Sequence, residues 1–272
     1  TFDIILAMKD EIFVNGFHNL EFSKLKNLTI SKKELPSPEF YKRLYSEIYS
    51  SKNSEMIDET FINAKVSLGQ NFYEIIKDTF KNFSEIKVLS SGAGFGISEA
   101  FLAEKGINIC AQEFFKSPNF WSEKVPYYSS LDSFDDNSFD LVFEASTLYC
   151  FSDDNLIQHL DELCKLIKKN GFIFIWEQES RSLSKLLIAK IKNFILKNFN
   201  LNLFKYHTLW GFLRTKNEFV EFLPSYMKLR KSFYYDQDQS CNLQLIKFSP
   251  RIFGRQIFYR RAKNQLHIFQ KS

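Results

Sequence analysis

From residue 86 onward, the sequence alternates short apolar runs with stretches of helical periodicity. The apolar runs are "IKVLSS", "INICAQEF", "VPYYSS", "SFDLVFEAS" and "GFIFIWE", and the helical stretches between them are "ISEAFLAEKG" and "NLIQHLDELCKLIKKN". Strands that alternate with helices build a parallel sheet with helices on both faces. The sequence therefore predicts an α/β fold with a doubly wound, mostly parallel sheet.

Local signals place several further elements. Asn170 and Gly171 fit the left-handed position that follows a helix, so we expect the preceding helix to end after Lys168. Residues 37–51 and 69–83 have apolar side chains at helical spacing and predict two helices before the sheet. We also expect a helix at "NEFVEFL" and closing antiparallel strands at "KLRKSFYY", "RQIFYRR" and "NQLHIFQ".

The distribution of charge divides the chain into segments. Residues 181–272 carry 18 Lys and Arg but only 4 Asp and Glu, although the net charge of the whole chain is only +4. We expect residues 1–85 to form an N-terminal helical extension that could cover the site, residues 86–180 the core, and residues 181–272 a basic cap segment with the closing strands of the same domain. The basic stretch 182–199 is amphipathic, so it could lie on a membrane surface, cover the acceptor site or pack on the domain. A solvated Lys-rich surface would explain the same charges.

Composition bounds the class of protein. With 44% hydrophobic and 25% charged residues, the chain has the proportions of a folded globular protein. Apolar runs are too short to span a membrane, and Lys9, Asp10 and Glu11 interrupt the stretch where a secretion signal would stay apolar, so we expect a cytoplasmic protein. The four cysteines and four histidines are widely spaced, which predicts neither a disulfide framework nor a metal site.

The stretch "VLSSGAGFG" places Gly92, Gly94 and Gly96 directly behind the first strand of the predicted sheet. Glycines remove the β-carbons that would hold a ligand away from the backbone, and the helix from about Ile97 offers unpaired N–H groups. A dinucleotide fingerprint would need its third glycine at position 97. The pattern favours a nucleotide-like ligand but not a nicotinamide cofactor.

Glu113 ends the second strand, 21 residues beyond Gly92. A carboxylate at this place can accept hydrogen bonds from both hydroxyls of a ribose. A surface glutamate at the end of a strand is the alternative interpretation of the same residue.

Three stretches resemble one family: "VLSSGAGFG", "DDNSFDLV" and "LDELCKLIKKNGFIFIWE". Together they are similar to class I S-adenosylmethionine-dependent methyltransferases that act on small molecules. The resemblance implies a Rossmann-like sheet of seven strands and S-adenosyl-L-methionine as cofactor. It places the cofactor against Ser91, Gly92, Ala93, Gly94, Gly96, Glu113, Phe114, Ser130, Leu131 and Glu144.

The sequence departs from the family pattern at three places. Ser90 stands two positions before the first glycine, where the family commonly has an acidic residue. The acidic residue that the family uses for adenine has no clear counterpart, so Ser130, Leu131 or Asp132 would take its place. After the fourth strand, Ser146 and Cys150 occupy positions that are often histidine.

Candidate catalytic residues lie where strands four and five end, and in the segment that covers them. They are Glu144, Tyr149, Glu177 and His207. Three of them have a structural alternative: Glu144 could cap the following turn, Glu177 could be an exposed surface residue, and His207 could be a core or surface histidine. Arg181 and Arg214 would suit a phosphate or carboxylate on the acceptor.

These observations predict an enzyme that transfers a methyl group by in-line displacement to an oxygen of a small molecule, such as a sugar or a lipid-linked precursor. Nitrogen is the second choice for the accepting atom. Two alternatives stay open: a non-catalytic binding or scaffold protein with the same fold, and an RNA-directed methyltransferase that uses the basic tail. We expect no DNA substrate, because "EAST" replaces the N/D-P-P-Y/F motif of amino-methylases after the fourth strand.

Overall fold

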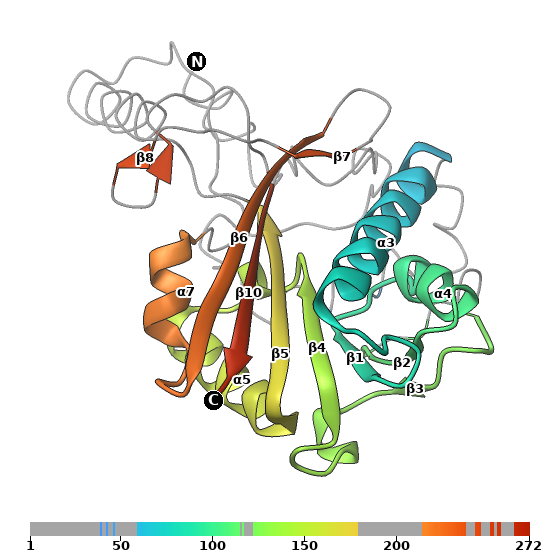
Figure 1. Ribbon diagram of the computed structural model, residues 1–272, viewed down its shortest axis with the longest axis horizontal. Coiled ribbons are helices and arrows are strands. Elements are labelled where there is room, and N and C mark those ends of the chain that lie inside the picture. Colours follow the sequence, from blue (N-terminus) through green and yellow to red (C-terminus); the bar gives the residue numbers. More distant parts are fainter. Residues whose placement is uncertain are drawn as a thin grey trace, which may run out of the picture.

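The computed structural model describes residues 59–114, 116, 122–178, 214–237, 243–245, 251–252, 255–256 and 264–272, together with Glu39, Lys42 and Ser46. The main sheet has the strand order β3-β2-β1-β4-β5-β10-β6-β7 (Figure 1). Its strands are β1 (Lys87–Ser91), β2 (Asn108–Gln112), β3 (Tyr127–Tyr128), β4 (Phe139–Ala145), β5 (Ile167–Gln178), β6 (Met227–Gln237), β7 (Leu243–Leu245) and β10 (Asn264–Lys271).

Strand direction follows the prediction of a mostly parallel sheet. β1 to β5 pair in parallel, whereas β10 is antiparallel to both β5 and β6, and β6 is antiparallel to β7. The first seven strands in the spatial order form the predicted seven-stranded arrangement, and the short β7 adds an eighth at the edge. The order reverses at β1, with β2 on one side and β4 on the other, and such a switch point is where open α/β sheets bind ligands.

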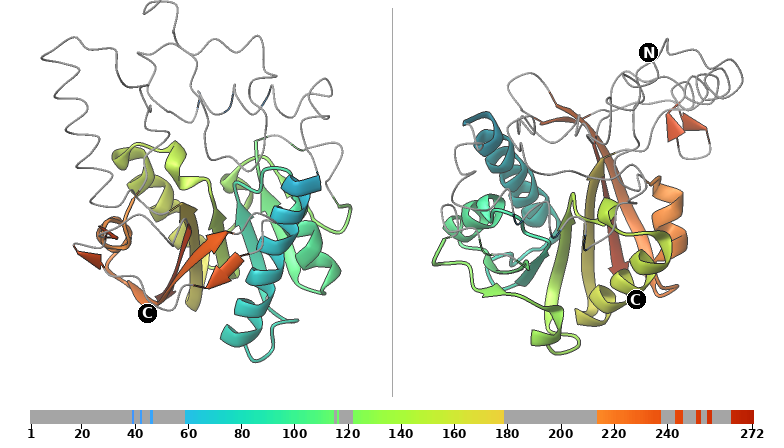
Figure 2. Two further views of the ribbon diagram at one scale, coloured as in Figure 1. Left: turned by 90° about the horizontal axis from the view of Figure 1, so that it is seen from above. Right: turned by 180° about the vertical axis from the view of Figure 1, so that it is seen from behind.

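Helices cover both faces of this sheet (Figure 2). α3 (Glu59–Thr79) and α4 (Ile97–Glu104) pack on one face, and α5 (Asp153–Leu166) and α7 (Lys216–Phe222) on the other. The short helices η3 (Leu131–Ser133) and η4 (Leu148–Cys150) follow β3 and β4.

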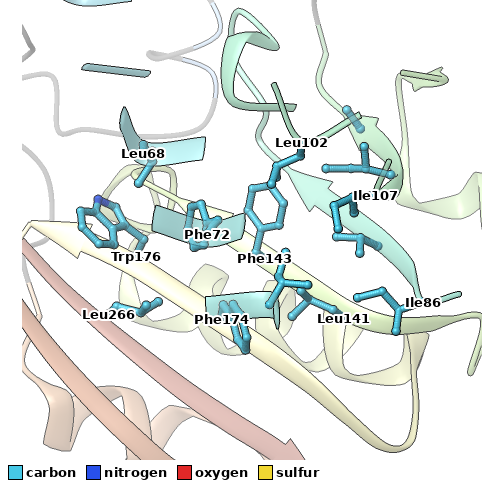
Figure 3. Packing of buried hydrophobic residues seen from close by; sticks show 14 of the residues in the cluster. Leu68, Phe72, Ile86, Leu102, Ile107, Leu141, Phe143, Phe174, Trp176 and Leu266 are labelled. Carbon is cyan, nitrogen blue, oxygen red and sulfur yellow. The ribbon is translucent and has the colours of Figure 1, made fainter. Parts of the chain in front are cut away.

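The core beneath α3 shows why the sequence packs this way. Leu68, Phe72 and Ile76 recur at intervals of four residues and are all buried, so one face of α3 is apolar. The Phe72 ring stacks on Phe143 of β4 with 4.7 Å between centroids, and it meets Trp176 of β5 edge to face (Figure 3). This packing holds α3 beside the carboxyl ends of β4 and β5.

Two predicted helices need correction. The helix before Asn170 ends at Leu166, earlier than expected, because buried Ile167 already has extended backbone and pairs with Phe139. Asn170 does adopt the left-handed conformation, with φ of 64°. The helix predicted at 69–83 spans Glu59–Thr79.

The predicted closing strands are confirmed at β6 and β10, and the helix at "NEFVEFL" is α7, which begins with a complete capping box between Thr215 and Glu218. The run "RQIFYRR" contributes only β9 (Arg255–Gln256), which pairs with β8 (Arg251–Ile252) in a separate two-stranded sheet. Most of the predicted helix 37–51 and all of segment 182–199 lie outside the described residues. Within the described ranges, every helix is too short or too polar to cross a bilayer.

Candidate functional site

A cavity of about 560 Å³ lies where the strands β1, β2 and β4 end. It is lined by the turn after β1, by the ends of β2 and β3, by the turn after β4, and by one face of α3. Of the residues predicted to bind the cofactor, the lining contains Ser91, Gly92, Ala93, Gly94, Glu113, Phe114, Ser130 and Leu131. Gly96 lies just outside the lining, at the N-terminus of α4.

The turn after β1 depends on its glycines. Gly92 and Gly94 have φ of 65° and 62°, in the left-handed region that other residues rarely adopt. A β-carbon on Gly92 would lie 2.5 Å from Cγ2 of Thr147 and 2.8 Å from its Cβ, distances at which atoms overlap. Thr147 also donates a hydrogen bond to the carbonyl of Gly92 at 3.2 Å. The two turns that line the cavity are thus in direct contact through Gly92.

Glu113 connects the turn after β1 to the end of β2. Its Oε2 accepts a hydrogen bond from the backbone N–H of Gly94 at 2.9 Å, and its Oε1 accepts one from Phe114 at 2.7 Å. The residue is only 4% exposed, so these donors hold its carboxylate in one place. A carboxylate oxygen can accept more than one hydrogen bond, which leaves capacity for the two hydroxyls of a ribose.

The turn after β4 is held from below by buried polar groups. Ser146 has φ of 61°, a strained value for a residue with a side chain, and its N–H donates to the carbonyl of Trp176 at 2.7 Å. The Glu177 carboxylate accepts the N–H of Leu148 at 2.6 Å. Arg214 donates to the carbonyls of Leu148 and Phe151 and to the Asp153 carboxylate. These contacts compensate for the strain and fix the wall of the cavity.

The predicted catalytic residues therefore have different positions. Tyr149 lines the cavity, whereas Glu144 and Glu177 lie beneath it, with 0% and 3% of their surface exposed. Glu144 Oε1 is 2.9 Å from Nε2 of His159. His207 and Arg181 lie outside the described residues. Arg214 was expected to bind the acceptor, but its guanidinium donates hydrogen bonds to Leu148, Phe151 and Asp153.

Several lining residues were not singled out from the sequence, among them Lys65, Glu99, Thr147 and His159. His159 flanks the buried stripe of Leu156, Leu160 and Leu163 on α5, so helical periodicity places it beside the core. Its ring stacks on Phe151, with 4.6 Å between centroids and an angle of 11° between the planes.

Glu177 gives the first testable prediction. Burial raises the pKa of Glu177 to about 8, and the nearby Glu144 adds to this, while the Leu148 N–H and the Arg214 charge oppose it. Between about pH 4.5 and 8 the folded chain keeps a proton that the unfolded chain has lost. The free energy of unfolding therefore falls as pH rises through this window, by at most about 1.4 kcal/mol per pH unit, and levels off above it.

Glu177→Gln removes this titration and keeps an oxygen that can accept from Leu148. We expect the difference in unfolding free energy between the variant and the wild type to grow in favour of the variant from pH 5 to 8, then to stay constant. Urea titrations across this pH range measure the difference. A difference independent of pH would contradict a protonated Glu177 in the folded state.

Residues 89–175 match the family model of a methyltransferase domain. The match assigns this segment to the methyltransferase-domain family and confirms the predicted resemblance to class I S-adenosylmethionine-dependent methyltransferases. No curated protein sequence matches the chain. Among solved structures, it resembles the 1,6-didemethyltoxoflavin-N1-methyltransferase of Burkholderia thailandensis, with 16% identity, a TM-score of 0.54, and coverage of 88% of this chain and 92% of the other.

Two further structures share the fold of this methyltransferase. The magnesium protoporphyrin IX methyltransferase of Synechocystis PCC 6803 is 10% identical with a TM-score of 0.52, and the match covers 87% of this chain and 96% of the other. Phosphoethanolamine N-methyltransferase 1 of Haemonchus contortus is 14% identical with a TM-score of 0.53, and the match covers 86% and 49%. At these identities the likeness establishes the fold alone.

The cavity of the methyltransferase fits S-adenosylmethionine on its own features. Gly92 lets the turn after β1 lie directly against Thr147 of the turn after β4, and the Glu113 carboxylate is held in place by the N–H of Gly94, where it can serve as a ribose acceptor. Glu99 also lines the cavity, and its buried Oε2 has no hydrogen-bond partner among the described residues. The glycine turn, the ribose acceptor Glu113 and the unsatisfied carboxylate oxygen of Glu99 match a ligand with hydroxyl groups and a positive charge.

Proposed function

We propose that the protein transfers a methyl group from S-adenosylmethionine to an oxygen of a small molecule. The observation that carries this proposal is a single cavity that contains the glycine turn, Glu113 and the turn after β4. Its volume of about 560 Å³ lies within the range typical of small-molecule sites. Candidate cofactor residues and candidate acceptor residues thus line one cavity.

The chemical character of the lining suggests how the cofactor is oriented. Lys65 and Glu99 lie toward the sheet face covered by α3 and α4, and they supply charges of both signs. Leu131 and Phe151 pack on the opposite face, and His159 stacks on Phe151. A flat adenine ring suits this apolar and aromatic end, where Ser130 and Asp132 offer hydrogen-bonding oxygens. Glu113 lies between the two ends and suits the ribose.

In this orientation, the methyl group that is transferred lies near the turn after β4. The bound cofactor supplies an activated methyl group, so the protein must mainly hold the accepting atom in line with it. Ser146, Thr147 and Tyr149 of this turn line the cavity and carry hydroxyls, and we assign to the Tyr149 hydroxyl the hydrogen bond with the acceptor. Glu177 and Glu144 act beneath the surface, where Glu177 holds Leu148 and Glu144 orients His159.

The nature of the accepting atom can be determined by direct assay. Purified protein is incubated with isotopically labelled S-adenosylmethionine and three panels of small molecules, namely carboxylates, alcohols with phenols, and amines, and the products are identified by mass spectrometry. Transfer to the first or second panel supports the proposal. Transfer only to amines would show that the accepting atom is nitrogen and not oxygen. Tight binding of S-adenosylhomocysteine without transfer to any panel or to RNA would favour a scaffold protein.

Tyr149→Phe tests the proposed position of the reacting centre. The variant keeps the aromatic ring but loses the hydroxyl, so we expect turnover of the identified acceptor to fall by about tenfold or more. The affinity for S-adenosylhomocysteine should stay within about twofold, because no cofactor contact is assigned to this hydroxyl. Calorimetry and initial rates separate the two effects. An unchanged turnover would remove Tyr149 from the reacting centre.

A further inference from the structure

Two ionisable side chains, Lys65 of α3 and Glu99 of α4, line the cavity without forming an ion pair with each other within the described part of the chain. Burial raises the pKa of Glu99, because it disfavours the charged form, and a cationic ligand group would act against this shift. Ser98 Oγ donates to the backbone carbonyl of Lys65 at 2.9 Å, so the backbones of the two residues are held close together by the fold.

Glu99 is buried with part of its hydrogen-bonding capacity unused. Only 3% of the residue is exposed, and it occupies the first turn of α4, where the helix dipole favours a negative charge. Its Oε1 accepts a hydrogen bond from Ser90 Oγ at 2.7 Å, while Oε2 has no partner among the described residues. Burial of an unsatisfied carboxylate oxygen is costly unless a ligand completes it.

Lys65 is the complementary group. Its ammonium lies 5.8 Å from the centre of the Phe61 ring, and both residues line the cavity. Burial lowers the pKa of Lys65, and the nearby carboxyl groups of Glu99 and Glu177 act against this shift. An anionic ligand group beside Lys65 would stabilise its charged form.

We propose that Lys65 and Glu99 bind the amino-acid end of S-adenosylmethionine, with Glu99 receiving the ammonium and Lys65 the carboxylate. Ser90, at the end of β1, lacks a carboxylate of its own and instead orients the one supplied by Glu99. The chain thus carries its acidic group on the helix after the glycine turn, in place of the strand before it. This inference rests on the proposed function, since it assigns one end of the same cofactor.

Two ligands distinguish this subsite from the rest of the cavity. S-adenosylhomocysteine carries the amino-acid chain on its sulfur, whereas 5′-methylthioadenosine has the same nucleoside and sulfur but only a methyl group in place of that chain. By calorimetry we expect Glu99→Gln and Lys65→Met to weaken S-adenosylhomocysteine about tenfold or more, the loss typical of one charge-assisted hydrogen bond. Both variants should bind 5′-methylthioadenosine within about twofold of the wild type, because that ligand does not reach the subsite.

Matched controls come from the same helices. Glu104→Gln changes an exposed carboxylate on α4, and Lys77→Met changes an exposed ammonium on α3, so neither should alter the affinity for either ligand. The double variant Ser90→Asp with Glu99→Ala returns a carboxylate to the end of β1. It should recover most of the affinity for S-adenosylhomocysteine that Glu99→Ala alone loses.

Each outcome has a distinct meaning. Equal losses for both ligands would show that Lys65 and Glu99 only support the fold, and unchanged binding of S-adenosylhomocysteine would show that they do not contact it. Either result overturns the inference and leaves the proposed function intact. Failure of the wild type to bind both ligands would overturn the proposed function itself. If Glu99→Gln does not fold, Lys65→Met and the double variant still decide the question.

Discussion

Replacing Gly92 with alanine is expected to destabilise the fold and to disrupt the cofactor site together. Alanine at φ of 65° costs about 1–2 kcal/mol, because its β-carbon crowds the following carbonyl. Overlap of the new β-carbon with Thr147 adds about 1–3 kcal/mol, as overpacking in a rigid region does. Relief of this overlap must move the turn that presents Gly94 to Glu113, so affinity for S-adenosylhomocysteine should fall about tenfold or more.

Gly106→Ala separates the two contributions. Gly106 also has a positive φ, of 85°, but a β-carbon there meets nothing within 4 Å. This control loses stability only through its backbone conformation and should bind S-adenosylhomocysteine like the wild type. Urea unfolding and calorimetry on both variants measure the comparison. Equal stability and equal affinity of the two variants would mean that the contact between Gly92 and Thr147 has no energetic importance.

Sequence periodicity was sufficient for most of the fold because the sheet is buried on both faces. The continuous apolar run "FIFIW" predicts a strand buried on both faces, and the helices between the strands carry clear apolar stripes. Prediction failed where elements are short or where an end depends on pairing. β7 has only three residues, and the end of α5 is set by the pairing of Ile167 with Phe139.

The candidate site was predicted less completely, for a reason that lies in the sheet itself. The glycines and Glu113 are adjacent to strand ends, so their place follows from topology. The sequence indicates which strands carry Glu144 and Glu177, but not the face of the sheet on which each side chain lies. Both faces of β4 and β5 are apolar, so polar and apolar residues do not alternate along these strands in a way that would identify the face. Both side chains are buried below the turn that follows β4. Lys65 and Glu99 lie 34 positions apart, and only the contact between α3 and α4 brings them together.

Arg214 is expected to be the most important single side chain for the wall of the cavity. It is 3% exposed and donates to the carbonyls of Leu148 at 3.1 Å and Phe151 at 2.7 Å, and to Asp153. Asp153 is itself largely exposed, so most of the effect of removing Arg214 comes from the two carbonyls that lose its guanidinium. The Leu148 carbonyl still accepts the N–H of Phe151 at 3.2 Å, so the Phe151 carbonyl contributes the larger part. Arg214→Met keeps the apolar volume but should lower the free energy of unfolding by about 2–4 kcal/mol.

The same substitution should also weaken the cofactor, because the strained turn at Ser146 persists only while its surroundings hold it. Arg230→Met is the matched control, since exposed Arg230 bonds only to Gln270 among the described residues, and its loss should change stability by no more than about 0.5 kcal/mol. Arg214→Lys keeps the charge but not the planar fork that reaches several acceptors at once, so its stability should lie between those of the wild type and Arg214→Met. Urea unfolding measures all three variants. If Arg214→Met were as stable as Arg230→Met, the turn would be held by Glu177 and the Trp176 carbonyl alone.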